Sequence, residues 1–143
     1  MYDYGISVNW LHVVVAAAAS MGLGFLWYSP MLFGKQWSEL MGWGPMTPEK
    51  MAEMKKKAQP MYAMAGVMAL VTSYVLARTI ASTRVYGASD AVKLAFWLWL
   101  GFVATVTYGE NMWSGKPKKL WVLNAGFHLV SLGLMAAILA GWR

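Results

Sequence analysis

Four long apolar segments constrain the fold more than any other feature of this sequence. They run from about residue 8 to 28, 61 to 82, 91 to 108 and 120 to 142. A helix needs about 20 residues to cross the hydrocarbon core of a bilayer, and these segments are close to that length. We therefore expect an all-α integral membrane protein, with residues 1–143 folded as one domain of four transmembrane helices in a compact bundle.

The overall composition supports a membrane protein and excludes several other classes. Hydrophobic residues make up 59% of the chain and charged residues 13%, which is too apolar for a soluble domain. The N-terminus carries no Lys or Arg before the first segment, so we expect a permanent span rather than a cleaved signal peptide. The absence of cysteine removes disulfides, iron–sulfur ligation and thiolate chemistry. The net charge of +6 comes from residues beside the spans, which indicates lipid headgroups rather than nucleic acid as partners.

The basic residues are distributed unequally between the two sides of the predicted topology. The side shared by the first and third loops has Lys35, Lys50, Lys55, Lys56, Lys57, Lys116, Lys118 and Lys119. The other side has Arg78, Arg84, Lys93 and Arg143. Basic residues in short loops favour the cytoplasm, so we expect both termini to lie outside.

The first loop contains a helix start. Thr47 can cap a helix, Pro48 suits its first position, and Glu49 would lie near the positive end of the helix dipole. We expect a short amphipathic helix over about residues 48–58, which could continue into the second span with a kink at Pro60. Its lysines indicate contact with water or headgroups, with partner docking as the alternative.

Small residues recur at a spacing of four in every span, which is typical of closely packed transmembrane helices. The four series are Ala16, Ser20, Gly24; Ala65, Ala69, Ser73, Ala77, Ala81; Gly101, Thr105, Gly109; and Gly133, Ala137, Gly141. In the fourth span, Asn124, His128 and Ser131 fall on the roughly opposite face. Two faces suited to protein contact suggest that bundles associate or that another subunit covers one side.

Polar residues near the inner end of the last two spans form the candidate site. We expect Tyr108, Glu110, Asn124 and His128 to build a polar cluster, because buried polar groups in lipid must find partners. The alternatives are a structural hydrogen bond between His128 and Asn124 or a neighbouring helix, and pairing of Glu110 with lysines of the third loop. His12 and His128 would lie at different depths, so we expect no metal site and no cofactor.

Several strings resemble a known bacterial membrane family, domain of unknown function 1761. They are "NW" at 9–10, "GFLWYSPMLFGKQW" at 24–37, "WLGFVA" at 99–104 and "LNAGFHLVSLGLMAAILAGW" at 123–142. The resemblance implies a four-span protein of the bacterial inner membrane with no established activity. It emphasises Trp27, Tyr28, Ser29, Pro30, Gly34, Lys35, Asn124 and His128. Phe127 stands where tyrosine is common in that family.

The sequence favours a non-enzymatic protein that acts through helix–helix assembly, as a homo-oligomer or as an accessory subunit of a membrane complex. The alternative is a small transporter or channel that uses Glu110, Asn124 and His128. A lipid-modifying enzyme ranks third, because the sequence shows no nucleophile–base pair, acidic metal motif or phosphate loop.

Overall fold

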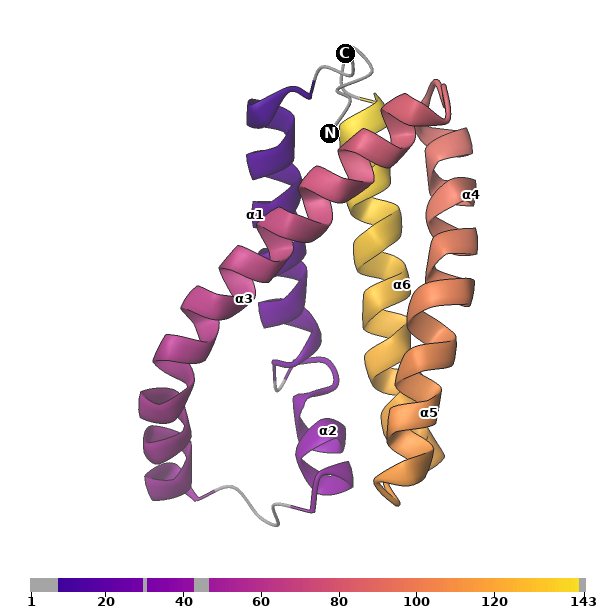
Figure 1. Ribbon diagram of the computed structural model, residues 1–143. Helices are drawn as coiled ribbons and strands as arrows, with labels where there is room; N and C mark the ends of the chain where they lie inside the picture. The colour runs from indigo at the N-terminus through magenta and orange to yellow at the C-terminus, as the bar shows by residue number, and fades with distance from the viewer. Residues whose placement is uncertain (1–7, 30, 43–46, 142–143) are drawn as a thin grey trace.

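The part of the chain that the structure describes folds into helices, four of which are long and apolar enough to cross a membrane (Figure 1). The computed structural model describes residues 8–29, 31–42 and 47–141, and within these residues it contains no strand. The helices are α1 (Trp10–Trp27), α2 (Gly34–Leu40), α3 (Pro48–Ser82), α4 (Ala88–Trp99), η1 (Leu100–Ala104), α5 (Thr105–Trp113) and α6 (Lys118–Gly141). The four candidate spans are α1, α3, the continuous α4–η1–α5 segment, and α6. Pro30 and Arg143 lie outside the described residues.

Helix α3 joins the predicted loop helix and the second predicted span into one helix of 35 residues. Thr47 caps it, because its hydroxyl accepts a 3.2 Å hydrogen bond from the Lys50 amide, and Pro48 occupies its first turn. Pro60 lies inside the helix, where it cannot donate a backbone hydrogen bond. Figure 1 shows α3 bending in its N-terminal third and then crossing the other helices obliquely. Helix α2, which has only 7 residues, was not predicted from the sequence.

The third span contains a π-helical segment, η1, between α4 and α5. A π turn inserts an extra residue and therefore rotates the face that follows it. Ala91 and Ala95 are buried before this segment and Ala104 is buried at its end, five residues after Trp99. The contact face thus runs through Ala91, Ala95, Trp99 and Ala104, with spacings of four, four and five residues.

The predicted small-residue series of the third span does not lie on this contact face. Gly101 and Thr105 are exposed, and a Cβ atom placed on Gly101 or Gly109 would meet nothing within 4 Å. The series therefore faces away from the helix contact.

Helix α6 is the central helix, with contacts to α1, α3, α4 and α5. A Cβ atom on Gly141 would lie 3.2 Å from the Ala88 side chain, and one on Gly133 would lie 4.0 Å from Val92. Its small-residue face therefore packs on α4, and its other face packs on α1. The sequence-based prediction assigned one of these faces to another chain, because a helix of a simple four-helix bundle has only one covered side. The central position of α6 covers both faces within one chain.

The core consists mainly of small side chains and lies where α1, α3, α4 and α6 meet. Its fully or nearly fully buried members are Ala16, Leu76, Ile80, Ala91, Ala95, Met135, Ala136 and Ala140. Alanine lets helix backbones approach closely, which is the main route to tight packing where lipid replaces water. Ser73, in the second series, is fully buried and donates a 2.8 Å hydrogen bond to the Val13 carbonyl. This bond ties α3 to α1.

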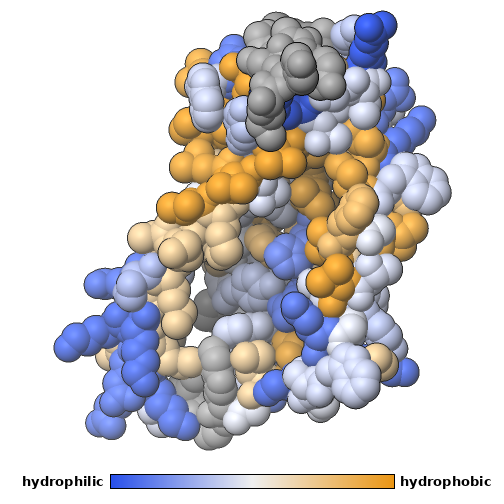
Figure 2. All heavy atoms as spheres, viewed as in Figure 1, coloured by the Kyte–Doolittle hydropathy of each residue, from blue (hydrophilic) through white to orange (hydrophobic). Residues whose placement is uncertain are grey.

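The two ends of the molecule differ in charge. Figure 1 places α2, the start of α3 and the α5–α6 turn at one end, with the start of α1 and the α3–α4 turn at the other. The eight lysines of the first and third loops lie on the elements of the first end. Figure 2 shows hydrophilic residues over the start of α3 and a mostly hydrophobic surface where α3 crosses toward the α3–α4 turn.

Candidate functional site

A pocket of about 690 Å³ lies between the helices, with walls from α1, α3, α6 and the η1–α5 segment. Figure 2 shows the viewed face hollowed beside α3. The volume is within the range of about 300–1,000 Å³ that is usual for small-molecule sites. The pocket uses the C-terminal half of α1 and the middle of α6, so it lies in the half of the molecule nearer the lysine-rich end.

Most of the lining is apolar. Aliphatic, methionine and aromatic side chains come from all four walls: Met21, Phe25, Ala65, Met68, Ala69, Phe102, Val103, Val106, Phe127, Leu132 and Met135. A smaller polar set contains Ser20, Tyr28, Tyr62, Thr72, Thr107, His128 and Ser131. The described lining contains no Asp, Glu, Lys or Arg.

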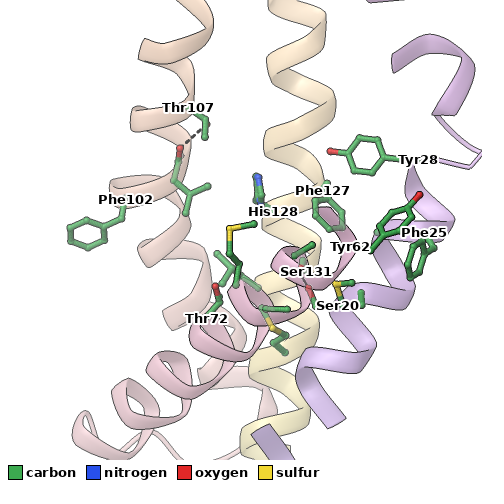
Figure 3. A pocket seen from close by; sticks show the side chains of 18 of the residues that line it. Ser20, Phe25, Tyr28, Tyr62, Thr72, Phe102, Thr107, Phe127, His128 and Ser131 are labelled. Atoms are coloured by element: carbon green, nitrogen blue, oxygen red, sulfur yellow. Dashed lines mark hydrogen bonds between the residues drawn. The ribbon is translucent and has the colours of Figure 1, made fainter. Parts of the chain in front are cut away.

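His128 is an exposed polar residue of this pocket. Its side chain is exposed, and Figure 3 shows the imidazole directed into the space between α6 and the helix that carries Thr107. Its ring lies against the neighbouring Phe127 ring, with 5.4 Å between centroids. Within the described part of the chain it makes no hydrogen bond. The imidazole is therefore available to a molecule in the pocket.

Tyr28 and Asn124 form a polar contact at one edge of the pocket. The Tyr28 hydroxyl donates a 2.8 Å hydrogen bond to Asn124 Oδ1. The Tyr28 ring also packs edge-on against Phe127, with 5.4 Å between centroids. Asn124 is one helical turn from His128, so this bond fixes α1 beside the part of α6 that presents the imidazole.

Ser20 and Ser131 form a second polar contact deeper in the pocket. Their hydroxyl oxygens are 2.7 Å apart, and both residues are buried. Each hydroxyl can donate one hydrogen bond and accept more, so the pair satisfies itself and joins α1 to α6.

Three tryptophans brace the walls by donating to backbone carbonyls on neighbouring helices. Trp27 donates to Leu123 over 3.2 Å and Trp99 donates to Ala125 over 2.8 Å. Trp121 donates to the Ala104 carbonyl over 3.2 Å and to a threonine hydroxyl on α5 over 3.1 Å. An indole N–H removed from water needs such a partner. These bonds hold α1, α4 and α5 around α6.

Backbone hydrogen bonds hold the end of α1 close to the start of α2. The Gly34 amide donates a 2.9 Å hydrogen bond to the Ser29 carbonyl, and the Phe33 amide donates a 3.0 Å bond to the Trp27 carbonyl. A Cβ atom on Gly34 would lie 2.6 Å from the Tyr28 carbonyl oxygen, so only glycine fits without a backbone shift. Lys35 is exposed. These contacts therefore direct Trp27 and Tyr28 toward α6.

The four residues of the predicted polar cluster have different surroundings in the structure. Asn124 pairs with Tyr28 of α1, and His128 faces the pocket. Tyr108 packs edge-on against the Trp121 ring with 5.2 Å between centroids, while Glu110 is exposed, and neither lines the pocket. The residues that share the pocket with His128 come from α1, α3 and the η1–α5 segment, and they include Tyr28 and Thr107.

The helices described above match a known family over nearly their whole length. A family model described as protein of unknown function (DUF1761) matches residues 11–140, so the chain belongs to this family. Comparison with curated proteins and with solved structures gave no match.

Proposed function

We propose that this member of the DUF1761 family crosses the bacterial cytoplasmic membrane with its four long helices and binds a small amphipathic molecule in its pocket. The proposal corresponds to the transporter alternative raised by the sequence, with the chain as a carrier or receptor for a membrane-soluble molecule. The lysine-rich end would face the cytoplasm. The pocket would then open within the inner half of the bilayer.

The observation that carries this proposal is the His128 imidazole, which projects without a hydrogen-bond partner in the described residues into a mostly apolar pocket. A strong polar group is costly to leave unpaired away from water. A ligand that brings a hydrogen-bonding group to His128 and an apolar body to the surrounding side chains would remove that cost. Such a ligand would be amphipathic.

Binding fits the arrangement better than catalysis. His128 has no hydrogen bond to a hydroxyl or a carboxylate in the described part of the chain, whereas an activated nucleophile needs an adjacent base that is itself oriented. The pocket hydroxyls of Ser20 and Ser131 bond each other. We therefore propose a non-enzymatic role.

Two variants of α3 test the pocket. Ala69 lines it, whereas Ala63 is exposed on the same helix and lies outside it. Native mass spectrometry of protein extracted in mild detergent should show a bound small molecule on the unsubstituted chain and on Ala63→Trp. Ala69→Trp should lose it, because the indole fills the pocket. An empty unsubstituted chain, or equal occupancy of both variants, would contradict the proposal.

Assembly with a second copy or an accessory subunit is the second candidate. The observation that favours it is a stripe on α3, where Val67, Val71 and Val75 recur at a spacing of four and are each more than half exposed. The same mass measurement gives the stoichiometry. A monomeric mass in every mild detergent would argue against assembly.

A further inference from the structure

The lining of the pocket also bears on the chemistry of its ligand. We infer that the pocket selects a lipid-like molecule whose polar head is uncharged and both donates and accepts hydrogen bonds, such as a hydroxyl on a long alkyl chain. This inference rests on the proposed binding function and narrows the class of ligand.

The lining carries no permanently charged side chain. The described residues around the pocket include no Asp, Glu, Lys or Arg. The lysines of the nearby end lie on α2, the starts of α3 and α6, and the α5–α6 turn, outside the pocket. To enter the pocket, a charged head would have to move out of the water or the headgroup layer, and it would find no opposite charge in the pocket. Burying an unpaired charge within the bilayer costs much free energy. The pocket therefore disfavours both anionic and cationic heads.

The helices leave some hydrogen-bonding capacity open around the pocket. In addition to His128, the Tyr62 hydroxyl and the Thr72 hydroxyl make no hydrogen bond in the described residues. Tyr62 and Thr72 belong to α3 and His128 belongs to α6, and Figure 3 shows all three around the same space. A neutral imidazole has one donor and one acceptor, and each hydroxyl offers both. A head with both capacities satisfies these groups better than a head that only accepts or only donates.

Apolar side chains on facing walls would hold the rest of the ligand. Met21, Phe25 and Met68 lie on the α1 and α3 sides of the pocket, and Phe102 and Val106 lie on the opposite wall. Flexible methionines adapt to chains of different shape. Contacts with an alkyl chain contribute to affinity but do not depend on direction. The selectivity of the pocket should therefore come from its contacts with the polar head.

Photolabelling with three probes that share a chain tests the inference. Hexadecanol, hexadecyl sulfate and hexadecyltrimethylammonium, each with a diazirine at the same carbon, are incorporated at equal mole fraction in nanodiscs that hold the full chain. Labelled residues are then mapped by peptide mass spectrometry. We expect the alcohol to label the pocket at least about tenfold more than either charged probe, given the cost of a charge at this depth.

Variants of α6 identify the contact. Val130 is an exposed residue of α6 outside the pocket and supplies the control. His128→Leu should lower labelling by the alcohol several-fold, whereas His128→Gln, which keeps a donor and an acceptor, and Val130→Leu should not. If His128→Gln keeps the labelling that His128→Leu loses, the loss reflects the missing hydrogen-bonding groups and not a folding defect.

The outcomes separate the inference from the proposed function. Equal labelling of the pocket by all three probes, or stronger labelling by a charged one, would overturn the uncharged head and leave pocket binding intact. Failure of every probe to label the pocket would overturn both.

Discussion

The Tyr28 hydroxyl donates a 2.8 Å hydrogen bond to Asn124, which links the residue that follows α1 to the first third of α6. These two residues are 96 positions apart in the sequence. Tyr28 also lines the pocket, so the same side chain contributes to helix packing and to the candidate site. By accepting this hydrogen bond, Asn124 holds the Tyr28 side chain in place at the edge of the pocket.

Tyr28→Phe should destabilise the fold slightly. The substitution removes the hydroxyl and keeps the ring contacts, so the free energy of unfolding should fall by about 0.6 kcal/mol, the average for hydrogen bonds between membrane helices, and by no more than about 1.7 kcal/mol. Thermal or denaturant unfolding in a defined detergent measures the change. Tyr62→Phe is the control, because the Tyr62 hydroxyl has no hydrogen bond in the described residues. Equal stability of both variants would show that the Tyr28–Asn124 bond contributes nothing.

Gly34→Ala should destabilise the fold although it adds only one methyl group. Its Cβ atom would approach the Tyr28 carbonyl oxygen to 2.6 Å and the Ser29 carbonyl carbon to 2.7 Å. Relief requires a backbone shift, and overpacking of this kind costs about 1–3 kcal/mol. Gly66→Ala in α3 is the matched control, since its Cβ atom would meet nothing within 4 Å. Unfolding of the two variants side by side gives the comparison, and a Gly34→Ala chain as stable as Gly66→Ala would refute the close approach.

The sequence predicts the helices well because their length and apolarity follow from the bilayer. The capping hydroxyl of Thr47 and the proline after it also fix the start of α3 correctly. Helix α2 escapes prediction because 7 residues are too few for a clear period. The π segment has no signal in side-chain chemistry, and Gly101 and Thr105, which the spacing of four placed on a contact face, are exposed.

The partner of Asn124 could not be predicted, because it depends on the rotation of α6 about its axis. Asn124 and His128 are placed on one face of α6 by the helical period alone. Which neighbour that face meets depends on how all helices pack, and the structure places α1 there. A usable signal existed in the motif that contains Trp27 and Tyr28, whose polar atoms both find partners on α6. Matching indole and phenol donors to unassigned polar groups in other spans would have suggested the contact.

The packing face of α6 can be tested with two glycines. Gly133→Leu should force α4 away, because Val92 already lies 4.0 Å from the position of a Cβ atom there. Gly101→Leu should be tolerated, because its Cβ atom would meet nothing within 4 Å. The fraction of each variant that stays monodisperse after heating, measured by size-exclusion chromatography, reports the difference. If heating aggregates Gly101→Leu and leaves Gly133→Leu monodisperse, the result would contradict the structure and favour the contact face predicted from the small-residue spacing of the third span.

Membrane orientation can be tested at positions that the structure selects. We expect α2 in the cytoplasm and the α3–α4 turn outside, because lysines concentrate at the α2 end. Ser38 is a poor labelling site, since it is buried and donates to the Gly34 carbonyl. Gln36 and Ser89 are exposed, and the chain has no native cysteine.

An impermeant maleimide applied to intact cells should therefore label Ser89→Cys at once and Gln36→Cys only after the membrane is permeabilised. The difference follows from the side of the bilayer alone, since both side chains are exposed in the folded chain. Labelling of Gln36→Cys in intact cells, with Ser89→Cys protected, would reverse the orientation. It would also move the pocket to the outer half of the bilayer, because the pocket lies nearer the α2 end in either case.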